Sequence, residues 1–282
     1  MATMLEHRVS TAHSVAAVFV MFVAVAGLFT LRASLVRAQT LPPPVICPTC
    51  WVPPLVTSWQ WQLDGRVDES VQATLYDVDM FDNDAALVAR LHAQGRMVIC
   101  YIDVGSWENW RPDKDSFPAE VLGKMYQGFR DERWLDIRRL DSLGPILGAR
   151  LDQCAAKGFD GAEPDNLEGY QNDTGFPLTF ADQLAFNVWI ANAAHSRGLN
   201  VALKNDGDQV ADLLPYFDWA LVEQCVQYDF CDQFVPFTQA GKAVMAAEYR
   251  GGTRRVCPVL NALNFNGIRK RVNLKKRRVP CR

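Results

Sequence analysis

Short apolar runs alternate with amphipathic stretches along the chain from about residue 55 onward. The runs contain consecutive apolar and β-branched residues, which is typical of strands buried on both faces of a parallel sheet. This pattern predicts seven strands and a weaker eighth, at 56–61, 71–78, 96–103, 159–162, 199–203, 219–222, 243–247 and 268–272.

Apolar residues at helical spacing lie between several of these strands. They predict helices over 84–94, 146–157 and 180–197, each followed by a glycine that can end a helix. Alternating strands and helices over about 220 residues predict a single α/β domain at 55–282, a closed (β/α)8 barrel of the TIM type. A doubly wound open sheet is the alternative, but the glycine-rich phosphate loop typical of that fold is missing from the sequence.

The N-terminal segment has the layout of a targeting sequence. Residues 15–31 are almost wholly apolar, Arg8 precedes them, and Ala38 follows at a suitable cleavage point. This layout predicts a secretory signal peptide over 1–38, and an uncleaved signal-anchor is the alternative. Residues 39–54 are proline-rich and are expected to form an extended lead-in. We therefore expect a secreted protein, which contacts a membrane at the cell envelope only if the leader is retained.

Eight cysteines lie outside the apolar leader. Cys47 and Cys50 have the spacing of half a zinc site, but no second such pair follows, so disulfides are the better interpretation. Cys225 and Cys231 are close enough to staple one loop. Cys257 and Cys281 could fasten the C-terminal end, although spacing alone does not determine the full connectivity. We expect neither a metal nor a cofactor.

The formal net charge of −3 conceals an asymmetric distribution. The leader contributes +2 and residues 269–282, which contain eight Lys and Arg and no acid, contribute +8, so the body carries −13. An acidic body does not suit nucleic acid, because phosphate binding needs a basic face. It suits either general solubility or a cationic partner.

Polar residues follow nearly every predicted strand, and a barrel gathers the C-terminal strand ends at one face. Asp and Asn often cap helices or make turns there. Glu is not a favoured cap, so Glu223 and Glu248 point towards a functional site. The strand-end residues and their neighbours that we expect to bind substrate are Asp64, Asp79, Tyr101, Asp103, Trp107, Asn166, Lys204, Asn205, Glu248 and Tyr249.

Carboxylates that converge beside aromatic rings suit glycoside hydrolysis, in which one carboxyl protonates the leaving oxygen and another attacks the sugar or activates water. Trp59 and Trp61 either stack on sugar rings or pack inside the barrel. A serine hydrolase is disfavoured, since the sequence has no Gly-x-Ser-x-Gly motif.

Several long motifs resemble family 114 of the glycoside hydrolases, the endo-α-1,4-polygalactosaminidases. They lie in the same order at 59–65, 76–82, 100–108, 158–166, 204–206, 223–225 and 248–249, and the resemblance is weakest from Cys257 onward. The resemblance implies a (β/α)8 barrel, secretion, and endo-cleavage of α-1,4-linked galactosamine polymers. It also implies that Asp165 and Glu223 are the catalytic acids.

Two alternatives stay open. Glu248 on the seventh strand could replace Glu223 as the second catalytic carboxylate, because many sugar-cleaving barrels place one there. The other alternative is a non-catalytic glycan-binding barrel at the cell envelope, which would need no acid pair. In either case we expect a monomer whose partner is a cationic, galactosamine-rich polysaccharide attracted to an acidic rim.

Overall fold

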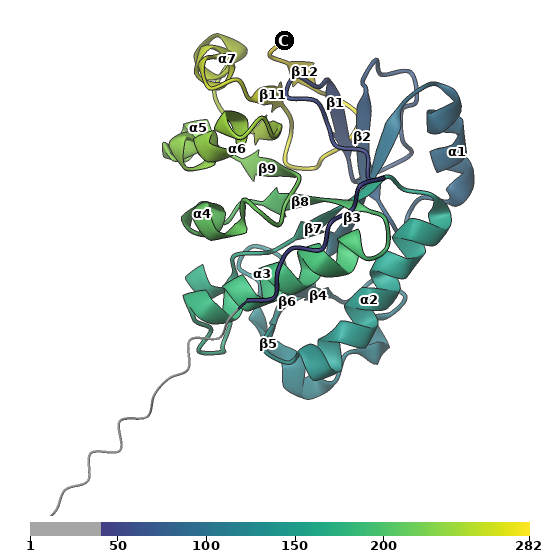
Figure 1. Cartoon of the computed structure of the whole chain (residues 1–282), viewed down its shortest axis with the longest axis vertical. Coiled ribbons are helices and arrows are strands. Elements are labelled where there is room, and N and C mark those ends of the chain that lie inside the picture. The colour runs from purple at the N-terminus through teal and green to yellow at the C-terminus, as the bar shows by residue number, and fades with distance from the viewer. Residues whose placement is uncertain (1–40) are drawn as a thin grey trace, which may run out of the picture. The chain divides into compact units, whose positions relative to one another are not determined.

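Eight parallel strands form a strongly curved sheet in the computed structural model, which describes residues 41–282. These residues make up one compact unit, Leu41–Arg282, and the sequence-predicted leader over 1–38 lies outside them. The parallel strands follow one another around the sheet in chain order (Figure 1). They are β1 Trp59–Gln62, β2 Leu75–Asp79, β3 Met97–Asp103, β7 Gly161–Asp165, β8 Asn200–Lys204, β9 Trp219–Glu223, β10 Val244–Glu248 and β11 Asn266–Arg269.

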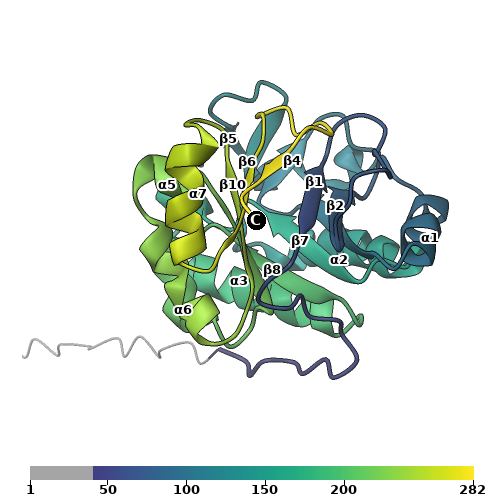
Figure 2. The ribbon, with the colours of Figure 1, turned by 90° about the horizontal axis from the view of Figure 1, so that it is seen from above.

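Each predicted strand overlaps one of these eight, which confirms the TIM-barrel-like α/β fold. The helices lie outside the strands (Figure 2). They are α1 Ala85–Ala93, α2 Leu140–Lys157, α3 Phe180–His195, α4 Val210–Leu213, α5 Cys225–Tyr228, α6 Val235–Gln239 and α7 Thr253–Ala262. Short 3₁₀ turns occupy Lys114–Ser116, Ala119–Val121, Gly169–Gln171, Gly207–Gln209 and Cys231–Phe234.

Local signals explain where two of the three predicted helices begin. The Asp84 side chain accepts a hydrogen bond from the Leu87 N–H and caps α1. Thr179 and Asp182 form a reciprocal capping box at the start of α3. The second helix begins at Leu140, earlier than predicted, because it accommodates Pro145 within its length.

Alternating side chains of the strands fill the barrel interior. The apolar ones form an inner cluster around Trp59, Trp61 and Trp219, while a larger apolar cluster lies between sheet and helices. Trp59 is 1% exposed, and its indole N–H donates to the Asn266 carbonyl at 2.7 Å. Trp59 therefore packs inside the barrel rather than presenting a face to sugar.

An antiparallel sheet that the sequence pattern did not predict follows β3. Its strands β4 Ser106–Glu108, β5 Leu122–Met125 and β6 Glu132–Leu135 are arranged in the order β4-β6-β5. The loop between β5 and β6 holds Tyr126, whose ring stacks on Trp134 with centroids 4.4 Å apart. This sheet extends the rim at the C-terminal ends of the strands.

The C-terminal segment closes the seam between β11 and β1. Strand β12, Val279–Pro280, pairs antiparallel with β11 and lies beside β1 in Figure 1. The Leu63 N–H donates to the Leu274 carbonyl at 3.1 Å, and Lys275 and Lys276 lie 3.6 Å from acidic residues of the body. The basic end of the chain therefore contacts the acidic body.

All eight cysteines are paired in the structure. Cys225–Cys231 staples one loop and Cys257–Cys281 fastens the C-terminal segment, which confirms the disulfide interpretation. Cys47–Cys50 closes a tight turn in the lead-in, and Cys100–Cys154 ties β3 to α2. Within residues 41–282, no helix is both long and apolar enough to span a bilayer.

Candidate active site

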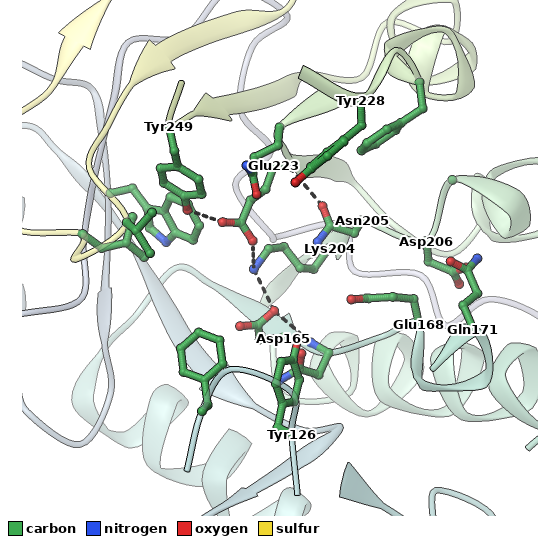
Figure 3. A pocket seen from close by; sticks show the side chains of 18 of the residues that line it. Tyr126, Asp165, Glu168, Gln171, Lys204, Asn205, Asp206, Glu223, Tyr228 and Tyr249 are labelled. Carbon is green, nitrogen blue, oxygen red and sulfur yellow. Dashed lines mark hydrogen bonds and ion pairs between the residues drawn. The ribbon is translucent and has the colours of Figure 1, made fainter. Parts of the chain in front are cut away.

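A cleft of about 730 Å³ opens at the C-terminal ends of the parallel strands (Figure 3). Its wall combines acidic, amide and aromatic side chains with one lysine. The principal lining residues are Trp61, Tyr101, Tyr126, Phe129, Glu132, Asp165, Asn166, Glu168, Gln171, Lys204, Asn205, Asp206, Asp208, Glu223, Tyr228, Phe230 and Tyr249.

Lys204 lies at the centre of the cleft floor and is 1% exposed. Its ammonium lies 2.7 Å from Asp165 Oδ1, 3.3 Å from Glu223 Oε2 and 3.0 Å from Glu163 Oε1. Burial lowers the pKa of Lys204, but the three carboxylates outweigh burial and hold that pKa well above its ordinary value. The Lys204 ammonium therefore stays charged and lies between the strand-end carboxylates of Asp165 and Glu223.

Asp165 ends β7 and accepts hydrogen bonds on both carboxylate oxygens. Oδ1 accepts from Lys204 and from the Asn166 N–H at 2.8 Å, and Oδ2 accepts from the Tyr101 hydroxyl at 3.0 Å. Asn166 turns the chain with a φ of 64°, a left-handed conformation that asparagine tolerates better than most residues. Gly105 fits against this turn, since an added Cβ would lie 1.9 Å from the Asn166 carbonyl oxygen.

Glu223 ends β9 on the opposite side of Lys204. It accepts a hydrogen bond from the Tyr249 hydroxyl, which projects from the strand end of β10. The Glu223 N–H donates to Asn205 Oδ1 at 3.0 Å, which fixes the backbone from which the carboxylate projects. Side chains from the ends of β8 and β10 therefore hold Glu223 over the cleft.

Three further carboxyl groups give the cleft an acidic wall. Burial, the main cause at each, raises the pKa of Glu132 and of Asp206 to about 7 and that of Glu168 to about 8. Figure 3 shows the Glu168 carboxyl directed towards the cleft centre, and its Oε2 has no hydrogen-bond donor within residues 41–282. A bound cation would lower the cost of ionising these groups.

The family profile of glycoside-hydrolase family GH114 matches residues 42–282. The chain belongs to family GH114. It is therefore a glycoside hydrolase.

Known structures agree with the family assignment. The crystal structure of Aspergillus fumigatus Ega3 in complex with galactosamine matches with a TM-score of 0.81 at 37% identity, over 85% of this chain and 100% of that one. The glycoside hydrolase domain of PelA from Pseudomonas aeruginosa shares the fold, with a TM-score of 0.63 at 15% identity over 80% and 98% of the chains. An uncharacterized protein of Deinococcus radiodurans is 32% identical over 190 residues, and the match covers 58% of each chain.

The structure brings seven of the twelve predicted site residues of this GH114 hydrolase into the cleft wall: Tyr101, Asp165, Asn166, Lys204, Asn205, Glu223 and Tyr249. Their roles in catalysis and binding stay predictions, but their side chains surround one cavity. Among residues 41–282 no group of three or more His, Cys, Asp or Glu is arranged to hold a metal ion.

Asp79 and Asp103 end neighbouring strands but lie outside the cleft wall. Asp79 accepts two hydrogen bonds from the guanidinium of Arg111, at 3.0 and 2.7 Å. Asp103, which is 2% exposed, accepts from the hydroxyl and N–H of Ser106 and from the Asn166 side chain. Both carboxylates therefore hold loops in place rather than facing the cleft.

Asp64, Trp107 and Glu248 also lie outside the cleft wall. Asp64 is largely exposed and lies 3.6 Å from Lys275. The Trp107 indole donates to a backbone carbonyl, and the ring lines a separate groove on the antiparallel sheet. Glu248 is 1% exposed and accepts from the Val226 N–H at 2.7 Å. Glu248 therefore holds the start of α5 rather than facing the cavity.

Sequence reasoning missed much of the cleft wall. Tyr126, Phe129 and Glu132 come from the antiparallel sheet and its loop, whose short strands gave no periodic signal. Glu168 lies a few residues beyond the end of β7, so extending the prediction along that loop would have found it. Asp206 lies within the motif at 204–206, but it was not included among the expected substrate-binding residues.

Proposed function

We propose that this GH114 hydrolase is secreted and cleaves internal α-1,4 linkages in galactosamine-containing polysaccharide by a two-carboxylate mechanism. The observation that carries the proposal is the pair Asp165 and Glu223, held by one buried ammonium in an acidic cleft. The likeness to Ega3, whose crystals contain galactosamine, supports the substrate class. The four disulfides support an oxidising, extracellular compartment.

The spacing of the two carboxylates favours retention of anomeric configuration. The Lys204 nitrogen lies 2.7 Å from one carboxylate oxygen and 3.3 Å from the other, so these oxygens are at most about 6 Å apart. Retaining enzymes hold their carboxyl groups about 5–5.5 Å apart, whereas inverting enzymes need about 6.5–9.5 Å to admit a water molecule. We therefore infer a covalent glycosyl-enzyme intermediate.

The hydrogen bonds favour Asp165 as nucleophile. Its two oxygens accept from Lys204, Tyr101 and a backbone N–H, and these donors stabilise a carboxylate rather than a carboxylic acid. Asp165 attacks the anomeric carbon, while Glu223 donates its proton to the departing glycosidic oxygen. Glu223 then removes a proton from water, which releases the sugar from Asp165.

Glu223 is the better general acid because it has fewer donors. It contacts Lys204 at the longer distance of 3.3 Å and accepts from the Tyr249 hydroxyl. Tyr249 keeps its proton, since burial, followed by the charge of Glu223, raises its pKa above the ordinary value. Its hydroxyl therefore remains a donor and orients Glu223 through the proton transfers.

The remaining cleft wall suits an aminated sugar chain. Glu132, Glu168, Asp206 and Asp208 face the cavity, so an ammonium on each galactosamine would find carboxylates at several positions. Aromatic rings of the same wall, such as Tyr126 and Tyr228, can stack on the apolar faces of sugars.

In the decisive experiment, the purified protein without residues 1–38 is incubated with partly deacetylated galactosamine oligomers. New reducing ends and the masses of the products are then measured. Asp165→Asn and Glu223→Gln are each expected to lower kcat by about 10²–10⁴-fold. Glu248→Gln is the matched control, since this carboxyl lies outside the cleft, and should retain most activity. Full activity in Glu223→Gln, or loss confined to Glu248→Gln, would refute the assignment.

The anomer of the first product, followed by NMR, tests retention separately. Release of the α-anomer supports the covalent route, and release of the β-anomer contradicts it. Secretion is tested by N-terminal sequencing of protein from the culture medium, which is expected to begin at Gln39.

A further inference from the structure

Two carboxyl side chains lie inside the barrel beneath the cleft and have no place in the mechanism above. Asp77 projects inward from β2 and Glu163 inward from β7, on either side of β3, and both are 0% exposed. Neither lines the cleft. The interior around them is otherwise largely apolar, so they require a physical explanation.

The two carboxyl groups interact with each other. Glu163 is the neighbouring acid whose charge, second only to burial, raises the pKa of the Asp77 carboxyl, and within residues 41–282 none of the four oxygens of the two groups has a hydrogen-bond partner. The nearby cation is Lys204, 3.0 Å from Glu163 Oε1. A hydrogen bond between two carboxyl groups requires a proton on one of them.

Charge balance indicates which groups are ionised. Lys204 is shared by Glu163, Asp165 and the protonated Glu223, so ionising Asp77 as well would place three anions around one cation. Burial, and then the charge of Glu163, raise the pKa of Asp77 well above its ordinary value, and burial raises that of Glu163 to about 7 despite Lys204. The proton therefore stays on Asp77, which can donate it to Glu163.

We propose that Asp77 and Glu163 are positioning residues, in which a protonated Asp77 donates to a Glu163 carboxylate that holds Lys204 between Asp165 and Glu223 and sets the alkaline limit of activity. This inference rests on the proposed function. It adds a buried acid–carboxylate pair that acts on the substrate only through the lysine.

Among the other groups near the lysine, the Glu168 carboxyl also interacts with its charge, but burial raises the pKa of Glu168 to about 8. Tyr101 and Tyr249 hold their protons and donate to the two catalytic carboxylates. The Trp61 ring lies 5.1 Å from the ammonium, a favourable contact that adds no formal charge. Without the charge of Glu163, the ammonium would act on Asp165 and Glu223 alone. The ammonium would then favour the carboxylate form of Glu223 more strongly, which weakens Glu223 as a general acid.

Three variants test whether Asp77 acts through its proton or through its shape. For each variant, kcat and KM on galactosamine oligomers are measured as a function of pH. Asp77→Asn keeps a donor to Glu163 and should retain activity within about threefold, with the alkaline limb in place. Asp77→Leu has no donor and should lower kcat about tenfold or more, with KM nearly unchanged. Glu163→Gln should move the alkaline limb about one unit lower.

The opposite pattern would overturn the proposal. If Asp77→Asn loses as much activity as Asp77→Leu, then Asp77 is an anion or acts by some other route. If the alkaline limb of the pH profile is unchanged in Glu163→Gln, then Asp77 and Glu163 do not control the proposed general acid Glu223. In either case, folding of each variant is verified by thermal unfolding before the rates are compared.

A substrate-free measurement tests the buried proton independently. Because the pKa of Asp77 is raised in the folded state, its protonation stabilises the fold at low pH, and that stabilisation is lost as pH rises through the folded pKa. The Tm of Asp77→Asn should therefore rise relative to wild type between about pH 5 and pH 8. A constant Tm difference would refute the buried proton. Inactivity of the wild type on every galactosamine oligomer would instead refute the proposed function and leave this unfolding test intact.

Discussion

Replacing Lys204 by methionine would show how far this domain depends on one buried charge. Methionine fills a similar volume and keeps the apolar contacts of the lysine stem, but it removes the ammonium. The substitution leaves Glu163, Asp165 and Glu223 beside one another without a cation, at a position that is 1% exposed. The loss should therefore be electrostatic rather than steric.

The expected magnitude follows from the burial of the ion pairs. Removing one partner of a buried pair costs about 3–5 kcal/mol. For a domain of this size each kcal/mol lowers Tm by about 2–4 °C, so the Tm of Lys204→Met should fall by about 6–20 °C near pH 8. Near pH 5 the stranded carboxylates take up protons, and most of the loss should be recovered.

The assay is thermal or urea unfolding of wild type and variant at both pH values. Leu203→Ala, at the neighbouring buried position of β8, is the matched control. Its cavity should cost about 2–5 kcal/mol regardless of pH. If Lys204→Met were equally destabilised at pH 5 and pH 8, Lys204 would act through packing, and the charge-based account of the site would be refuted.

Three other changes test separate parts of the structure. Tyr249→Phe removes the donor to the proposed general acid and should lower kcat about 10–100-fold with KM little changed, whereas a change confined to KM would place Tyr249 in binding instead. Gly105→Ala drives a Cβ to 1.9 Å from the Asn166 carbonyl oxygen, so it should lower both Tm and kcat, and unaltered kinetics would contradict the tight loop contact. The double variant Cys257→Ser/Cys281→Ser opens a disulfide with a separation of 24 residues and should cost about 3 kcal/mol in urea unfolding. It should also raise KM, because the freed segment contributes to the cleft wall, and an unchanged KM would show that the wall keeps its shape without the bond.

The meeting of Asp165, Lys204 and Glu223 in one cleft could be predicted from sequence because it depends on short-range rules. Each buried strand is a recognisable apolar run, and parallel strands of a barrel bring their C-terminal ends to one face. Asp165, Lys204 and Glu223 directly end or follow such runs, so a correct strand assignment was enough to place them together. The family motifs that contain these residues pointed to the same three positions.

The assignment of the other carboxylates depended on distant partners. Asp79 is satisfied by Arg111, and Glu248 by the Val226 N–H, contacts that strand patterns do not reveal. The same holds for Tyr126 and Phe129, whose place in the cleft depends on how the antiparallel sheet folds against the rim. Short irregular strands carry too little periodicity to be read from a single sequence.

The sequence by itself determined the barrel, the acidic character of the body and the residues at the strand ends, because apolar periodicity and charge are local properties. Only the tertiary structure decided which carboxylates face the cleft, which ones hold loops, and which two acids are buried beneath Lys204. It also showed that the basic C-terminal segment closes the barrel seam. These outcomes depend on burial and on partners far apart in the chain, since the ionisation of a carboxyl group is governed by the donors and charges that the fold brings within a few ångströms.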